Sequence, residues 1–212
     1  MARVTNLMNI AVSGKVGNVV FCNGPVRGSY TRTLPKKSEV RSEKQLNTQN
    51  KVAIANRFLN PLRPLIEEVW QKDRYTRKTA FGSAFSHMMK HAFRGGYMEE
   101  EIVYSEVLFS RGSLIKPEGL TARRERTRVE VVWEENARSG VDALPEDKAV
   151  LVIYNETKEM SISITGTAVR GDGRMIAELP PVYGTDRLHA YLFFVNRNRR
   201  WASDSVYAGC LE

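Results

Sequence analysis

Arg128-Val-Glu-Val-Val-Trp-Glu134 and Lys148-Ala-Val-Leu-Val-Ile-Tyr-Asn155 are the two segments that decide the fold. Successive side chains of a strand point to opposite faces, so the apolar residues at 129, 131 and 133 share one face of the first segment. In the second segment, either the odd-numbered or the even-numbered apolar residues could line that face. This period of two predicts short antiparallel strands.

The same pattern extends from about residue 102 towards the C-terminus, with Gly, Asn, Asp and Pro clusters between the apolar runs. The strand candidates are Ile102–Phe109, Gly119–Arg124, Arg128–Glu134, Lys148–Asn155, Ser161–Thr165, Met175–Leu179, Leu188–Asn196 and Ala202–Tyr207. About seven short strands around a buried tryptophan, without a disulfide, resemble the fibronectin type III branch of immunoglobulin-like folds. We therefore expect residues 99–212 to form an antiparallel β-sandwich.

Residues 42–98 carry helical signals instead. Ser42 and Gln45 have the form of a capping box, which predicts that a helix begins there. Apolar residues then recur at spacings of three and four to about Trp70, interrupted by Asn60-Pro61. We expect either one kinked helix or two helices at about 42–59 and 61–71. A third helix is expected from about Thr79 to Arg94, with Gly95-Gly96 as its stop.

The first 41 residues are rich in glycine and in basic side chains. Val16–Cys22 and Ser29–Leu34 flank Asn23-Gly24-Pro25, which predicts a β-hairpin in which Tyr30 and Arg32 share a face. A lone hairpin is only marginally stable in water, so it must pack against the helices or against another chain. The predicted protein is thus α+β, with a hairpin arm at 1–41, a helical region at 42–98 and the sandwich at 99–212.

Charge is distributed unevenly along the chain. Residues 1–98 hold 17 lysines and arginines against 5 aspartates and glutamates, whereas residues 99–212 hold 15 against 19. The overall net charge of +8 therefore comes from a basic half joined to an acidic half. A basic half suggests that the chain binds either a polyanion or an acidic surface of a protein partner.

Motifs for catalysis or metal binding are incomplete. Ser13-Gly-Lys-Val-Gly-Asn18 has some glycines of a phosphate-binding P-loop, but Val16 stands in place of its Ser/Thr, so we interpret these as turn glycines. His87 and His91 have the spacing of zinc ligands without the rest of a ligand set nearby. No Gly-x-Ser-x-Gly elbow occurs. We expect no enzyme, no cofactor, no metal and no small-molecule substrate.

The basic groups beside aromatic residues are the better candidates for contacts with a partner. The first group follows the hairpin turn and consists of Arg27, Tyr30, Arg32, Lys36, Lys37 and Arg41. The second lies in the turn Arg197-Asn-Arg-Arg-Trp201 and consists of Arg199, Arg200 and Trp201. Both groups are predicted partner-binding residues.

Several motifs along the chain resemble one family closely. They are Ser13-Gly-Lys-Val-Gly-Asn-Val-Val20, Tyr30-x-Arg32-x-x-Pro35, Ser42-x-x-Gln45-x-x-x-Gln49, Phe58-Leu-x-Pro61, Leu108-x-Ser-Arg-Gly-Ser-Leu114 and Asp204-Ser-Val-Tyr207. The family is a domain-of-unknown-function family from Bacteroidota and their phages, with proteins of about this length. The resemblance implies no known activity and no catalytic residues. The hairpin, Tyr-x-Arg and Gln-bearing helix are also similar to the openings of some small phage structural proteins.

Our hypothesis is a non-enzymatic structural or assembly protein, a virion-like or mobile-element component that docks on another subunit or self-associates through its basic hairpin and helices. The alternative is a sequence-independent nucleic-acid binder that uses the basic half. A carbohydrate- or peptide-binding sandwich rests on fold analogy alone. The sequence has no apolar run long enough to span a membrane and no secretory signal, so we expect a cytoplasmic protein that could enter a virion.

Overall fold

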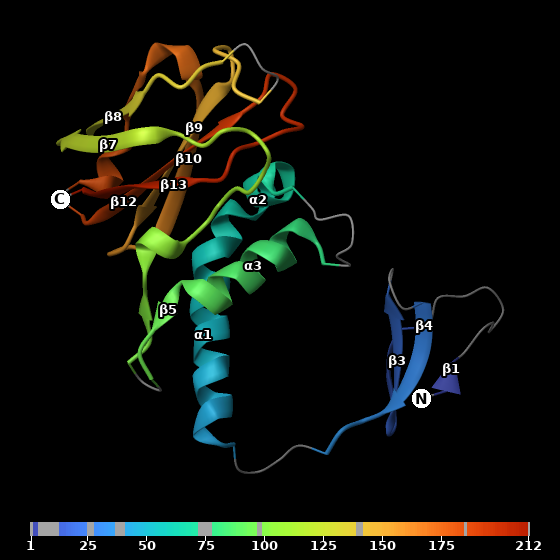
Figure 1. Cartoon of the computed structure of the whole chain (residues 1–212). Helices are drawn as coiled ribbons and strands as arrows, with labels where there is room; N and C mark the ends of the chain where they lie inside the picture. Colours follow the sequence, from blue (N-terminus) through green and yellow to red (C-terminus); the bar gives the residue numbers. More distant parts are fainter. Residues whose placement is uncertain are drawn as a thin grey trace. The chain divides into compact units, whose positions relative to one another are not determined.

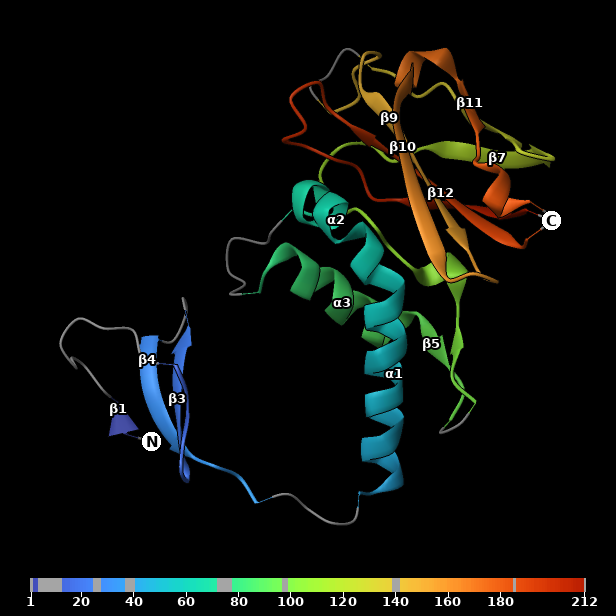
Figure 2. The same cartoon turned by 180° about the vertical axis from the view of Figure 1, so that it is seen from behind.

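The computed structural model describes residues 2–3, 13–24, 28–36, 41–71, 78–96, 99–138, 142–184 and 186–211. The chain divides into two compact units, Met1–Ser42 and Glu43–Glu212. Figure 1 shows the first unit in blue and the second in cyan to red, and Figure 2 shows the same molecule from behind. The predicted α+β class is confirmed, with an N-terminal sheet, one long helix and several antiparallel sheets in the C-terminal part.

The first unit is a four-stranded sheet in the order β1-β4-β3-β2. Its strands are β1 (Ala2–Arg3), β2 (Gly14–Val16), β3 (Val19–Gly24) and β4 (Gly28–Thr33). The predicted hairpin is the β3–β4 pair. The predicted start of its first strand is wrong, because Gly17 and Asn18 form a turn and Val16 pairs back onto Val19 from β2. Gly17 has φ of 56°, a backbone conformation that glycine adopts without steric cost.

Three helices open the second unit. They are α1 (Glu43–Leu59), α2 (Arg63–Val69) and α3 (Ala80–His91), with the 3-10 turn η1 (Asn60–Leu62) between the first two. The break that Pro61 predicts is therefore confirmed. The hydroxyl of Thr79 caps α3 by accepting a hydrogen bond from the Gly82 amide at 3.0 Å.

The end of the third helix differs from the prediction. α3 stops at His91, because Phe93–Arg94 (β5) pairs with Glu101–Ile102 (β6) in a two-stranded sheet. The strand candidate Ile102–Phe109 is wrong beyond its first residue, since Tyr104–Glu106 forms the 3-10 turn η2.

Seven strands follow in two antiparallel sheets. One sheet has the order β11-β8-β7, from Arg174–Glu178, Arg128–Glu134 and Glu118–Glu125. The other has the order β10-β9-β12-β13, from Met160–Val169, Lys148–Asn155, Leu188–Val195 and Val206–Leu211. The last strand begins four residues later than the candidate Ala202–Tyr207, because residues 202 and 203 form only isolated bridges. Two further 3-10 turns, Arg170–Asp172 (η3) and Pro181–Tyr183 (η4), flank β11.

The central strands β9 and β12 are buried on both faces. Val150, Val152 and Tyr154 of β9 belong to a core shared with the three helices. Leu151 and Ile153 belong to a second core, shared with the other sheet and including Trp133. Both sets of apolar residues that the sequence offered for this strand are thus used, one on each side. The helices cover one face of the four-stranded sheet, and the three-stranded sheet covers the other (Figure 1).

Candidate functional site

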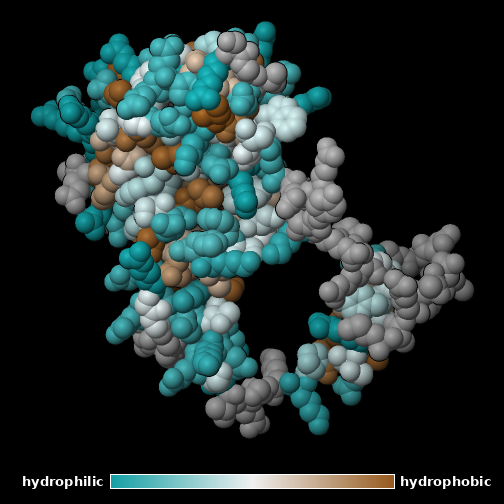
Figure 3. Space-filling view, in the orientation of Figure 1, coloured by the Kyte–Doolittle hydropathy of each residue, from teal (hydrophilic) through white to brown (hydrophobic). Residues whose placement is uncertain are grey.

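One face of the N-terminal sheet carries no charged side chain among the residues that the structure describes. Residues opposite each other in an antiparallel pair share a face, so the register of the strands assigns the side chains. The larger side chains of this uncharged face are Val16, Val19, Phe21, Thr31 and Thr33. Val16 is 67% exposed and Val19 is 39% exposed. Figure 3 shows hydrophobic as well as hydrophilic surface on this unit.

The opposite face of this sheet is basic. Its described side chains include Lys15, Val20, Cys22, Tyr30 and Arg32. The predicted common face of Tyr30 and Arg32 is thus confirmed by the register. Lys36 and Arg41 are exposed in the segment that follows, whereas Arg27 and Lys37 lie outside the described residues.

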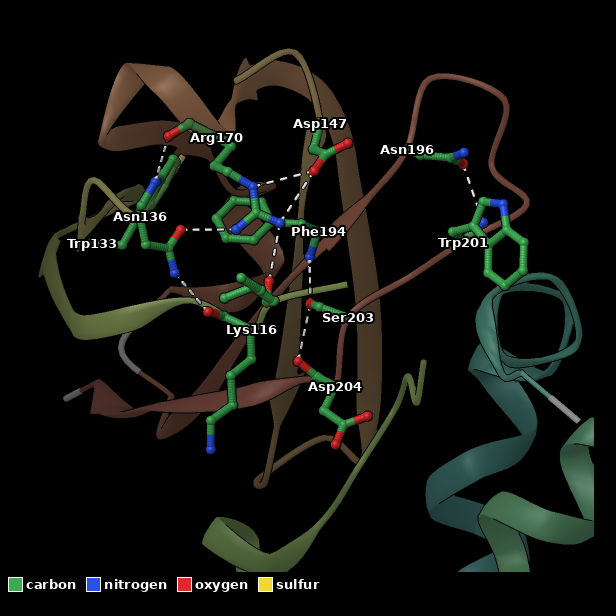
Figure 4. Close-up of polar contacts among 11 residues, drawn as sticks. Lys116, Trp133, Asn136, Asp147, Arg170, Phe194, Asn196, Trp201, Ser203 and Asp204 are labelled. Atoms are coloured by element: carbon green, nitrogen blue, oxygen red, sulfur yellow. Dashed lines mark hydrogen bonds and ion pairs between the residues drawn. The ribbon is translucent and has the colours of Figure 1, made fainter. Parts of the chain in front are cut away.

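The second predicted group lies in the other unit, in the loop between β12 and β13. Arg199 forms an ion pair of 3.2 Å with Glu68 of α2, and Arg200 is exposed. The side-chain oxygen of Asn196 accepts hydrogen bonds from the amides of Arg200 and Trp201 and so shapes the loop. The ring of Trp201 projects from this loop and is 52% exposed (Figure 4).

Two motifs that are distant in sequence meet in the second unit. We call residues 110–114 the strap. The Ser110 hydroxyl donates to the Ser203 carbonyl at 2.8 Å, and the Gly112 amide donates to the Asp204 carboxylate at 3.0 Å. The Leu114 amide donates to the carbonyl of residue 202 at 3.0 Å. The strap is therefore fixed against residues 202–205.

Glycine is required at the centre of the strap. A Cβ atom at Gly112 would lie 2.0 Å from the carbonyl oxygen of Ala202, which is too close for any other residue. On its other side the strap bonds to the end of α2, where the Gln71 amide donates to the Arg111 carbonyl at 2.8 Å. These contacts fix Arg111 beside α2 and α3.

A cavity of about 590 Å³ lies between the end of α2, α3 and the strap, and we call it the cationic pocket. Lys78 and one polar side of α3 line it, together with Arg111. The α3 side chains in the lining are Ser83, Ser86, His87, Lys90 and His91. Their spacings of three and four place most of them on one side of the helix. The buried residues Ala80, Ala84 and Met88 lie on the side that packs into the core.

The pocket concentrates positive charge. Lys78, Lys90 and Arg111 line it, and no aspartate or glutamate among the described residues does. Burial lowers the pKa of His87 below its usual 6.5, and His91 and Arg111 lower it further, while Asp204 and Glu106 oppose the shift. His87 is therefore mainly neutral at pH 7, and the nearby Arg111 guanidinium is one of the groups that oppose its protonation.

Two polar atoms at the pocket lack partners within the described part of the chain. They are Nε2 of Gln71 and Nδ1 of His87, which are both buried. The His87 and His91 rings lie 4.6 Å apart. Within the same described ranges, no three or more His, Cys, Asp or Glu side chains gather where they could hold a metal ion.

A family model described as a family of unknown function, DUF6266, matches residues 11–209. The chain belongs to DUF6266. The resemblance seen in the sequence motifs is thereby confirmed. No curated protein matches this DUF6266 chain.

None of the helices in its described ranges has the length and apolar character needed to cross a membrane.

Sequence reasoning missed the cationic pocket of this DUF6266 chain. The polar side of α3, from Ser83 to Lys90, was visible as a periodic pattern within one helix. The contribution of Arg111 could not be predicted, because nothing in the sequence around it shows that the strap packs against α3. The motifs around residues 110–114 and 204–207 marked the segments involved, but not that they bond to each other.

Proposed function

We propose that this protein is a non-enzymatic structural or assembly protein, a virion-like or mobile-element component that docks onto another protein subunit through its N-terminal sheet. One observation carries the proposal. None of the residues of Met1–Ser42 whose burial is described is buried, and neither hydrophobic core includes any of them. A small sheet without buried apolar residues gains little stability by itself, so contact with another surface would stabilise it.

The uncharged face of this sheet suits protein contact better than nucleic-acid contact. Val16, Val19 and Phe21 form an apolar stripe across β2 and β3. Burying an exposed valine contributes about 1.5 kcal/mol or more, so a few such residues give a useful docking energy. Phosphate contacts need cations, and this face has none among its described residues.

The first turns of α1 offer a second surface for docking. Residues 43–54 include no buried residue, whereas Ala55, Phe58 and Leu59 pack into the core. Figure 1 shows this part of α1 extending away from the two larger sheets of its unit, β11-β8-β7 and β10-β9-β12-β13. Of the helical region that was expected to take part in docking, we therefore propose the N-terminal half of α1.

We further propose that the seven strands form a sandwich of fibronectin type III type. In immunoglobulin constant-type domains the first, second and fifth strands lie in one sheet, the third, sixth and seventh lie in the other, and the fourth strand joins the first of these sheets. Here β7, β8 and β11 occupy the first set and β9, β12 and β13 the second, with the fourth strand, β10, beside β9. The buried Trp133 in the second strand supports this assignment.

Light scattering of the full chain over a micromolar concentration series tests the docking proposal. We expect the wild-type chain to self-associate, or to bind a candidate subunit mixed with it. The double variant Val16→Glu, Val19→Glu should abolish the association, because it places charge on the uncharged face. The docking proposal would be refuted if the chain stayed monomeric at every concentration and also failed to bind the candidate subunits.

A matched control uses the other face of the same sheet. Lys15→Glu and Arg32→Glu change charge without touching the uncharged face, so protein association should survive them. This expectation departs from the prediction that Arg32 itself contacts the partner, because the proposal places the contact on the opposite face of the sheet. If the nucleic-acid alternative were correct, the pattern would reverse. Polynucleotide binding would weaken steeply with salt and vanish in the Lys15 and Arg32 variants, while the valine variant would retain it.

A further inference from the structure

The cationic pocket presents mainly hydrogen-bond donors. Lysine and arginine side chains donate and cannot accept, and serine hydroxyls donate readily to an anion. No aspartate or glutamate among the described residues lines it, although the Asp204 carboxylate accepts a hydrogen bond from the amide of the lining residue Gly112. Neither Lys90 nor Arg111 forms an ion pair within the described ranges. A ligand that fits this surface must be negatively charged and rich in acceptor oxygens.

The two unpartnered buried atoms support the same conclusion. Buried polar groups in folded proteins nearly always have hydrogen-bond partners, and one without a partner calls for an explanation. The Gln71 amide nitrogen is a donor, and a neutral His87 ring can donate from one nitrogen. Both residues line the pocket, and a rotation of either side chain would turn its buried nitrogen towards a ligand oxygen there.

We propose that the cationic pocket binds the phosphate group of a small phosphorylated molecule or of inorganic phosphate. A phosphate dianion has three acceptor oxygens, and arginine matches its geometry with two parallel N–H donors. Lys90 and Arg111 approach from α3 and from the strap and would hold the anion between them. Ser83 and His87 would donate to its remaining oxygens.

The shape of the pocket favours a small ligand over a polymer. A volume of about 590 Å³ lies within the range of about 300 to 1,000 Å³ that is usual for small-molecule sites. Three chain segments line this open hollow, whereas non-specific nucleic-acid binding uses an extended basic groove. This inference is independent of the N-terminal sheet, and it departs from the expectation that the chain binds no small molecule.

Nuclear magnetic resonance titration of the full chain tests the proposal at individual residues. Inorganic phosphate, phenyl phosphate and succinate are added separately at constant ionic strength. We expect saturable shifts at the amides of Gly112 and Ser113 and at the His87 imidazole with either phosphate compound. Tighter binding of phenyl phosphate identifies a phosphomonoester as the ligand, and equal binding identifies inorganic phosphate.

Variants tie the shifts to the pocket. Lys90→Gln and Arg111→Gln should each weaken phosphate binding roughly tenfold, because each removes one charge-assisted contact. Lys44→Gln is the matched control, since Lys44 is an exposed lysine on α1 that does not line the pocket. Lys90 is also exposed on its helix, so its variant should fold even if the Arg111 variant does not.

Three results would overturn the proposal. The first is the absence of saturable shifts at Gly112 and His87 with both phosphate compounds. The second is binding of succinate as tight as that of phosphate, which would show a general anion site. The third is phosphate binding that Lys90→Gln and Lys44→Gln weaken equally, which would show non-specific attraction to a basic chain.

Discussion

The guanidinium carbon of Arg170 lies 4.1 Å from the centre of the Phe194 ring, and both side chains are fully buried. The guanidinium also contacts the Asp147 carboxylate at 3.2 Å and donates to the Asn136 side chain at 2.8 Å. Burial raises the pKa of Asp147, and Arg170 opposes that shift. Arg170 follows β10, Asp147 precedes β9 and Asn136 follows β8, so one buried cation connects three segments of the chain (Figure 4).

Arg170→Ala should therefore destabilise the protein strongly. It leaves the Asp147 carboxylate buried without its partner, which costs about 3 to 5 kcal/mol in comparable sites. The free energy of unfolding in urea measures this loss. Arg174→Ala, at an exposed arginine in β11, should change stability by no more than about 0.5 kcal/mol.

A double substitution separates charge from packing in this network. Because an apolar pair leaves no charge uncompensated, Arg170→Met with Asp147→Leu should recover much of the loss caused by Arg170→Ala. The same urea measurement applies. Equal instability of the single and double variants would show that the hydrogen bonds to Asn136 and to the Ile115 carbonyl matter more than the ion pair.

The buried His189 should make stability depend on pH. Its nitrogens hydrogen-bond Tyr207 at 2.9 Å and Glu156 at 3.1 Å, and its ring stacks on Tyr104 at 3.6 Å. Burial lowers the pKa of His189 below its usual 6.5, although Glu156 opposes the shift. The unfolded chain therefore binds a proton at a higher pH than the folded chain does. Stability should fall as pH drops through about 6.5 and level off below the folded pKa.

The variant His189→Gln isolates this contribution. Its unfolding free energy should fall less than that of the wild type between about pH 7.5 and pH 5.5, because one proton-binding difference is gone. Above about pH 7.5 the two proteins should show parallel curves. Identical slopes across the acidic range would exclude His189 as a source of the pH dependence.

The second unit should fold without the first. Both hydrophobic cores consist of residues from Glu43 onward, and the contacts of the chain separate at the same place. A chain that starts at residue 43 should melt cooperatively within about 4 °C of the full-length protein, which corresponds to a stability change of about 1 kcal/mol. Circular dichroism during heating measures this. A broad transition in the shortened chain would show that the N-terminal sheet contributes to the core.

Gly112→Ala should destabilise the strap. The new methyl group would meet the Ala202 carbonyl, so one of the two segments must move, at a cost of about 1 to 3 kcal/mol. Chemical denaturation measures the cost, and the amide shifts of the pocket should change with it. Gly96→Ala is the control, because no atom lies within 4 Å of its added Cβ and stability should change little.

Local patterns in the sequence predicted most strands and helices well. The bounds of β8 and β9 agree with the prediction, because burial on at least one face and clear turn residues define them. The segment from Val103 to Phe109 was misassigned, because its apolar residues pack from a 3-10 turn and irregular chain rather than from a strand. The apolar residues of this segment correctly predict that it is buried, but they do not predict its backbone conformation.

Contacts between distant segments could not be predicted in the same way. Arg199, predicted to contact a partner, forms an ion pair with Glu68 of α2 in the same chain. The sequence around Arg170 does not indicate that its side chain is buried, because an arginine at a strand end is usually solvated. Cys210 is exposed and Cys22 is half-buried, although cysteine is among the residues most often buried. The partner of an ion pair and the burial of a side chain both depend on which distant segment packs against it. The residues nearby in the sequence do not indicate which segment that is.

The strap also determines when the pocket can form. Its hydrogen bonds join residues 93 positions apart, as between Ser110 and Ser203. Contacts with such a long separation close late in folding, after the entropy of the intervening chain has been lost. During synthesis the helices and the strap emerge well before residues 202–205. Nascent chains on the ribosome should therefore have α3 but not its pocket, so a ligand could bind only the finished unit.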